Sequence, residues 1–278
     1  MKFLSKFYIG LIFLILYAPI LVVIIFSFNA SGSLSNFAGF SLYWYRELFR
    51  DGEALAALKN SLFLAVTSSC LATLIGTLAA FAISRSKNKY YKRTAESVSN
   101  IPMMNPDIVT GVSMMLLFVG VGAIIGLGDT LGMWTMLIAH TTFNLPYAIL
   151  QILPRFRQMD KSLTEAALDL GCTPAQTFFR VELPYIMPGV ISGLMMGFTL
   201  SLDDFVISHF VSSPDFKTLP LYIYNQTAHE VKFSMYALCT LMMVAILILL
   251  IAVNVAGSAG ESRQRKKDRK LSGGSKVR

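Results

Sequence analysis

The chain has 278 residues, of which 54% are hydrophobic and only 14% charged, and its formal net charge is +8. A soluble domain of this size rarely has so few charged residues, and the mean hydropathy of +0.58 places the chain among membrane proteins. The apolar runs are too long and too evenly apolar for the strands of a membrane barrel, in which hydrophobic residues alternate with period two.

Six apolar runs are long enough to cross a bilayer, since about 20 helical residues span the roughly 30 Å of hydrocarbon. The first run follows Lys2 and Lys6. Its length, and the lack of a small-x-small cleavage site after it, indicate a retained span rather than a cleaved signal peptide. The predicted spans are Tyr8–Phe28, Ser61–Ile83, Ile108–Gly126, Leu131–Ile152, Val190–Val211 and Ser234–Val255. The sequence therefore predicts an all-α membrane protein with about six transmembrane helices.

The Lys and Arg residues predict the orientation of these spans. Most of them fall near the N-terminus, within residues 85–93 and 155–180, and in the tail 263–278, and all these segments share one side of the membrane. Because cytoplasmic loops carry an excess of Lys and Arg, we expect both termini in the cytoplasm. The same bias explains the net charge without a nucleic-acid partner.

Between the spans, the sequence predicts several local features. Outside, the aromatic run Tyr43–Tyr45 indicates a short amphipathic segment at the membrane interface. Inside, Arg85–Glu96 is a basic loop. Asp107 suits the start of the third span, where a carboxylate complements the helix dipole. His140, in the fourth span, is expected to hydrogen-bond between helices. We expect residues 1–258 to form one transmembrane domain and the basic, Gly/Ser-rich residues 259–278 to be a disordered tail.

A polar segment, residues 160–184, separates the fourth and fifth spans and carries the signals of two short helices. Ser162 and Glu165 have the spacing of a capping box at the start of the first helix. Gly171 follows that helix where a left-handed residue is favoured. Thr173-Pro174-Ala175-Gln176 then repeats the start signal. The second helix is expected to end at Leu183-Pro184.

This polar segment has two interpretations. It is a self-capped connector between spans, or it is a docking element whose Phe178 and Phe179 offer an apolar face to a partner. The caps and the amphipathic pattern alone favour neither interpretation.

Asp203 and Asp204 lie about midway along the fifth apolar run. One Asp at the centre of a membrane helix costs roughly 2.5–3.5 kcal/mol on insertion scales, so two need compensation. Adjacent helical residues point about 100° apart, so the two side chains have different surroundings. One interpretation places a carboxylate on an ion or substrate pathway. The other is a broken helix in which Asp caps the second half, assisted by Ser201.

The polar segment also resembles a known motif. The pattern E-A-A, three residues, G, nine residues and V-x-L-P is similar to the EAA motif of ABC-importer permeases. Further stretches, NPDIVTGVSMMLLF, the H-x-T-F-x-L-P run and FTLSLDDFVISHFV, resemble the polyamine branch, which carries spermidine and putrescine. The chain departs from this branch before the last span, where Phe233-Ser234-Met235-Tyr236 replaces the usual Pro-Glu-x-Asn pattern. The motif positions are Glu165, Ala166, Ala167, Gly171, Val181, Leu183 and Pro184.

The resemblance implies a type I importer permease fold and a bacterial plasma-membrane location. It implies that the motif forms coupling helices which dock on cytoplasmic ATPase subunits. The implied partners are a second homologous permease subunit, two ATPase subunits, an extracytoplasmic polyamine-binding protein and the lipid membrane. The sequence has no G-x-x-x-x-G-K-[ST], so hydrolysis is expected on the ATPase partners, and the chain itself is expected to be no enzyme. We expect no catalytic residues, no cofactor and no metal, and we expect Asp203 and Asp204 on the substrate pathway.

Other functions stay open at this point. Related permeases carry iron, sulfate-type anions or organic cations, and the EAA motif does not distinguish them. An ion-coupled secondary transporter would use Asp203 and Asp204 as ion sites, but it leaves the capped polar segment unexplained. A channel or structural subunit would tolerate bulky substitutions at Ala167 and Gly171.

Overall fold

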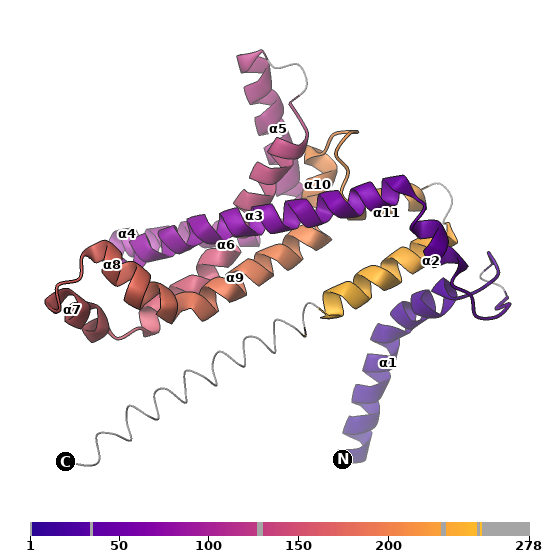
Figure 1. Cartoon of the computed structure of the whole chain (residues 1–278), viewed down its shortest axis with the longest axis horizontal. Coiled ribbons are helices and arrows are strands. Elements are labelled where there is room, and N and C mark those ends of the chain that lie inside the picture. The colour runs from indigo at the N-terminus through magenta and orange to yellow at the C-terminus, as the bar shows by residue number, and fades with distance from the viewer. Residues whose placement is uncertain (1, 34–35, 127–129, 229–231, 249–250, 252–278) are drawn as a thin grey trace. The chain divides into compact units, whose positions relative to one another are not determined.

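The computed structural model describes residues 2–33, 36–126, 130–228, 232–248 and 251. These residues belong to two compact units, one made of Met1–Ala57 with Tyr222–Ala252, and the other containing Leu58–Leu221. Helices account for most of the described residues (Figure 1). The tail predicted at 259–278 lies outside them.

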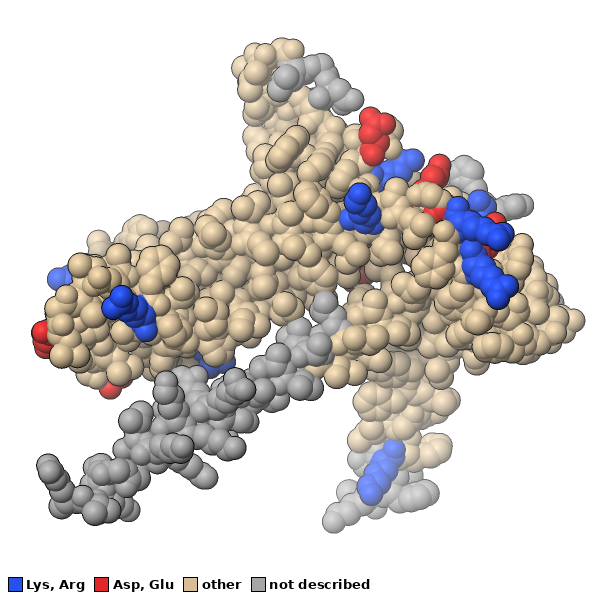
Figure 2. All heavy atoms as spheres, viewed as in Figure 1, with Lys and Arg blue, Asp and Glu red and all other residues tan. Residues whose placement is uncertain are grey.

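Helices long and apolar enough to cross a membrane occur where the first five spans were predicted. They contain most or all of α1 (Lys2–Ser27), α3 (Gly52–Arg85), α5 (Asp107–Ile125) and α6 (Met133–Gln158), together with a continuous stretch Pro174–Asp203. The shorter apolar helix Phe233–Ile248 covers the described part of the sixth predicted span. Charged side chains are sparse over the visible face of the long helices (Figure 2).

The first unit contains α1, α2 (Tyr43–Leu48), the start of α3, most of α11 (Leu219–Thr227) and helix Phe233–Ile248. A buried Asn29 organises its loop, because the Asn29 side-chain amide donates to the carbonyl oxygens of Ser33 and Asn36 at 3.1 and 2.9 Å. Trp44 Nε1 donates to the Asn29 carbonyl at 2.8 Å. The predicted short segment at Tyr43–Tyr45 is therefore a helix fixed by this loop.

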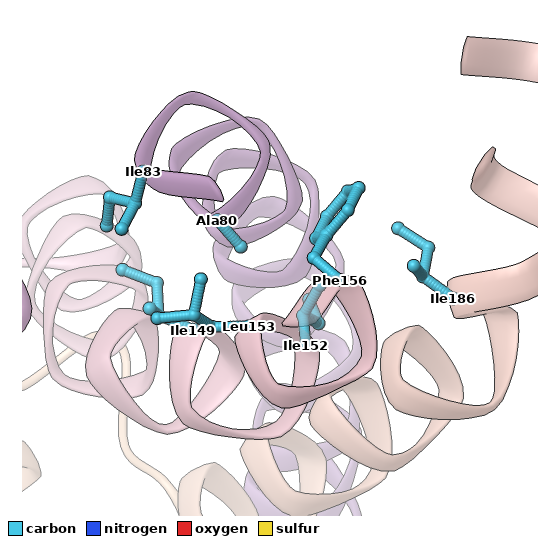
Figure 3. Close-up of a cluster of buried hydrophobic side chains, with 7 residues drawn as sticks. All are labelled: Ala80, Ile83, Ile149, Ile152, Leu153, Phe156 and Ile186. Carbon is cyan, nitrogen blue, oxygen red and sulfur yellow. The ribbon is translucent and has the colours of Figure 1, made fainter. Parts of the chain in front are cut away.

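The second unit is built on the packing of α6 against α9 (Leu183–Asp203) and α3. Figure 3 shows side chains from the three helices meeting in one apolar cluster. Such clusters supply specific packing rather than a strong hydrophobic drive when the surrounding solvent is lipid. The buried members are Ala80, Ile83, Ile149, Ile152, Leu153, Phe156 and Ile186.

The predictions for the loop Arg85–Glu96 and for the fifth span were wrong. The basic loop Arg85–Glu96 is largely helical, since α4 (Lys89–Met104) begins at Asn88, whose side chain accepts from the amides of Tyr90 and Tyr91. The fifth span is not one helix over Val190–Val211. It starts earlier and is broken after Asp203, and α10 (Val206–Val211) follows the break. Figure 1 shows α7 (Lys161–Asp169) and α8 (Pro174–Thr177) at the end of α9 opposite this break.

Candidate functional site

The carboxylate of Asp204 stabilises the break in the fifth span. Its two oxygens accept from the backbone amides of Ile207 at 3.2 Å and Ser208 at 2.8 Å. The first amides of a helix have no partner within that helix, so a carboxylate beside them stabilises the new start. The broken-helix interpretation of Asp204 is therefore present in the structure.

His140 bridges the two sides of the break. Its Nδ1 lies 2.7 Å from Ser201 Oγ on α9, and its Nε2 lies 3.1 Å from Ser208 Oγ on α10. Nε2 is also 3.5 Å from Asp204 Oδ2. His140, Ser201 and Ser208 are all buried, where polar groups need hydrogen-bond partners from the protein. The prediction that His140 hydrogen-bonds between helices is confirmed.

The network continues to α3. Ser68 Oγ donates to Ser201 Oγ at 3.1 Å, and the amide of Asn144 on α6 lies 3.4 Å from Ser68 Oγ. Asn144 Oδ1 is buried and has no hydrogen-bond partner among the described residues. Ser201 thus joins a cross-helix network instead of assisting the cap. Small polar side chains commonly link membrane helices in this way.

Asp203 differs from its neighbour in its surroundings. Asp203 is exposed on this chain, whereas only 7% of the Asp204 side chain is exposed. Asp204 therefore stabilises the start of α10, whereas the exposed carboxylate of Asp203 is accessible to a cation. The sequence alone did not separate the two roles.

A third carboxylate lies at the start of α5, which packs against α10. A Cβ added at Gly111 would lie 2.9 Å from a ring carbon of Phe210 and 3.5 Å from Ile207 Cα, so the two backbones approach closely there. Asp107 is exposed and lies at the start of the helix, as predicted; it is the first residue of α5 and precedes this contact by about one turn.

The second candidate site is the polar segment 160–184. Asp160 caps α7, because its side chain accepts from Ser162 N at 3.0 Å. Hydrogen bonds from the Ser162 backbone and hydroxyl hold the pKa of Asp160 below its ordinary value. The capping box predicted from Ser162 and Glu165 was wrong, since the carboxylate two residues earlier takes the capping position.

The turn after α7 follows the sequence closely. Gly171 has φ +86°, and its amide donates to Leu168 O at 2.9 Å. The Cys172 amide donates to Ala167 O at 3.1 Å, which completes a Schellman motif. The second capping box is confirmed: Thr173 Oγ accepts from Gln176 N, and Gln176 Oε1 accepts from Thr173 N.

The second short helix does not stop at Leu183-Pro184. A π-helical turn, η1 (Phe178–Glu182), joins α8 directly to α9. Leu183 N donates to Phe178 O five residues earlier, so the helix widens just before the residue that lacks an amide hydrogen. The second half of the polar segment, from Pro174, and α9 are consequently one continuous helix up to the break after Asp203.

The motif residues divide into a surface and a core set. Glu165, Ala166, Gly171 and Pro184 are exposed, Ala167 is buried, and Val181 and Leu183 are half-buried. Large apolar side chains of the same segment are exposed as well. Their exposed fractions are 86% for Leu170, 64% for Phe179, 45% for Leu163 and 39% for Leu168.

Phe178 does not belong to this surface. Its ring lies 4.9 Å from that of Phe81 and packs on the core cluster of Figure 3. Only Phe179 of the predicted aromatic pair is exposed.

Two features were missed from the sequence. Glu182 is buried and ion-paired with Arg85. Gly189, Gly193 and Gly197 recur every four residues along α9 and pack closely against α6 or α3. The small-xxx-small spacing within an apolar run was an available signal for the glycines. Within the described residues, His, Cys, Asp and Glu form no group of three suited to a metal ion.

A family model described as "Binding-protein-dependent transport system inner membrane component" matches residues 72–259. The chain belongs to this family. The inner membrane component described here is 41% identical to the putrescine transport system permease protein PotI of Escherichia coli K12, over 84% of this chain and 83% of the relative. It is 38% identical to the spermidine/putrescine transport system permease protein PotC of the same strain, over 87% and 89%.

Solved structures bear on the fold of this inner membrane component. A bacterial ABC transporter involved in the import of alginate superposes with a TM-score of 0.74 at 16% identity, covering 93% of this chain and 95% of that one. The inward-facing MetNI methionine ABC transporter gives 0.58 at 19% identity, covering 74% and 93%. The prediction of an all-α importer permease fold is confirmed, and the chain is a membrane-spanning transport component.

Proposed function

We propose that this chain is the permease subunit of an ATP-driven importer that moves polyamines such as spermidine and putrescine into the cytoplasm by alternating access. The observation that carries the proposal is the identity to PotI and PotC over most of each chain. ATP hydrolysis takes place on separate subunits, and the chain is inserted with both termini in the cytoplasm of a bacterial cell.

Asp203 supports a cationic cargo. A carboxylate attracts an ammonium group most strongly where water is scarce, and intramembrane carboxylates mark ion and substrate routes. Because Asp203 is exposed while Asp204 binds the α10 amides, Asp203 makes the direct cargo contact. Asp204 acts on the pathway by fixing the break.

The polar segment supports coupling to an ATPase. Its exposed residues include the apolar Leu170 and Phe179 as well as the motif positions Glu165 and Gly171. Such a patch on a short, well-capped helix pair suits a groove on a protein partner. The complete importer contains a second homologous permease subunit, two ATPase subunits and an extracytoplasmic polyamine-binding protein.

The test is uptake of labelled spermidine and putrescine in cells that lack their own polyamine importers and express the complete system. Asp203→Asn should lower uptake, whereas Asp215→Asn, an exposed carboxylate after α10, serves as the matched control and should not. An assembled, ATP-hydrolysing complex that takes up no polyamine would refute the substrate class. Uptake that persists with ATP held constant after collapse of the proton gradient would argue against an ion-coupled transporter.

A further inference from the structure

The carboxylate of Glu182 is a buried charge within the polar segment. It is the last residue of η1, stands between motif positions Val181 and Leu183, and is only 1% exposed. A buried carboxylate is costly unless it is paired and hydrogen-bonded. The partners of Glu182 therefore show which helices this carboxylate connects.

One oxygen of Glu182 connects three elements. Oε1 is ion-paired with the guanidinium of Arg85, the last residue of α3, and it accepts from Thr164 Oγ on α7 at 3.2 Å. The Arg85 guanidinium carbon also lies 5.4 Å from the centre of the Phe81 ring, which packs edge-on against Phe178 of η1. The cytoplasmic end of α3 is thus fastened to η1 by an ion pair and by aromatic packing.

The position of this cluster determines how a force on α7 can spread. The main packing partners of α7 are α8 and η1. From η1, one route leads through the helix backbone into α9 and the break at Asp203. The other route leads through Glu182 and Arg85 into α3, a helix of 34 residues that carries Ser68 of the polar network.

Glu182 is also incompletely satisfied. Its second oxygen, Oε2, is buried and lacks a hydrogen-bond partner among the described residues. A half-satisfied buried carboxylate is costly, so the ion pair with Arg85 and the hydrogen bond from Thr164 are the interactions that offset its burial.

We propose that Glu182 is a positioning residue for coupling, which makes α3 move with α7 when the ATPase displaces the polar segment. This inference rests on the proposed function, since it requires an ATPase docked on that segment. Without the pair, α7 would still dock and hydrolysis would continue, but α3 would not follow.

The experiment uses the complete importer reconstituted in lipid vesicles, with ATP hydrolysis and polyamine transport measured on the same sample. Glu182→Gln keeps the side-chain shape and the acceptor for Thr164 but removes the charge. Residues in a coupling network alter coupling by about 2- to 30-fold, so transport per ATP hydrolysed should fall within that range while subunit assembly is retained. Arg85→Gln should give the same loss, and the double variant should be no worse than either single variant.

Arg157→Gln is the matched control. Arg157 is ion-paired with Glu96 of α4, and its side chain is 47% exposed, as is that of Arg85. Within the part of the chain that the structure describes, Arg157 forms no ion pair with the polar segment. Its transport per ATP should equal that of the wild type. Arg85→Lys, which keeps the charge, should retain most of the coupling.

The outcomes separate the inference from the function on which it rests. A wild-type complex that hydrolyses ATP without moving polyamine overturns the proposed function. A working wild type with unchanged transport per ATP in Glu182→Gln and Arg85→Gln overturns the inference alone. If Glu182→Gln fails to assemble, Arg85→Gln decides, and an equal loss of transport per ATP in Arg157→Gln also overturns the inference.

Discussion

Gly189 provides a specific test of the close packing of α9 against α6. A Cβ at this position would lie 2.8 Å from the carbonyl oxygen of Gln151 and 2.7 Å from Arg155 Cγ. The Arg155 side chain can move, but the carbonyl belongs to α6 and cannot. Overpacking of this kind costs about 1–3 kcal/mol. We therefore expect Gly189→Ala to separate α9 from α6 and to destabilise the protein.

Gly120→Ala is the matched control, because a Cβ there would meet nothing within 4 Å. Both substitutions gain about 1 kcal/mol or less of helix propensity, so this gain cancels in the comparison. The difference between the two variants should be about 1–3 kcal/mol, or roughly a 5- to 160-fold change in the unfolding equilibrium constant. Reversible unfolding by SDS in mixed micelles, followed by circular dichroism, measures it. Equal unfolding midpoints for the two variants would refute the close α6–α9 approach.

His140→Ala should destabilise the second unit by about 1–3 kcal/mol, because the buried Ser208 hydroxyl loses its His140 partner and the Ser201 hydroxyl keeps only Ser68. The exposed His209→Ala is the control in the same unfolding assay. A loss of stability no larger than the control's would contradict the role of His140 at the break. Asp51 should make stability depend on pH. Burial alone would raise its pKa, but hydrogen bonds from Tyr222, Ala54 and Glu53, and the charge of Lys232, hold the pKa below its ordinary value. A carboxylate whose pKa is lower in the folded than in the unfolded protein stabilises the fold at pH values above its unfolded-state pKa, about 3.9. This stabilisation is lost as the pH falls through the folded-state pKa. Asp51→Asn should remove this contribution, so the unfolding midpoint of the variant should fall less than that of the wild type as the pH is lowered. An unchanged pH dependence of the unfolding midpoint would contradict the role of Asp51.

Features that depend on short stretches of sequence were predictable. The apolar runs predicted the positions of the long helices. Gly171 and Thr173 predicted the turn, because left-handed residues and capping boxes depend on only a few neighbouring positions. Local signals failed where two of them competed. Asp160 and Ser162 can both cap the start of a helix. Glu165, three residues after Ser162, favoured Ser162, whereas the structure has Asp160 as the cap. The helix predicted to end at Leu183-Pro184 continues through η1 into α9.

Long-range partners could not be predicted from one sequence. Arg85 and Glu182 are 97 residues apart, and His140 lies 61 and 68 residues from its two serines. No periodicity connects such positions, because they meet only when α3, α6 and α9 pack. The separate environments of Asp203 and Asp204 followed from the same packing, since the helix break that distinguishes them is stabilised by His140.

The break after Asp203 also bears on hydration. The last carbonyl groups of α9 have no partners within that helix, and irregular backbone at membrane depth persists only where protein buries it or water reaches it. Asp203 is exposed there, so in the assembled importer we expect water at this level. The thiol of Asp203→Cys should accordingly react with a water-soluble reagent, while a thiol introduced into the middle of the apolar helix α1 should not. An ammonium group arriving at the break would then exchange only part of its hydration shell for carboxylate and carbonyl oxygens, and could leave again without a large barrier.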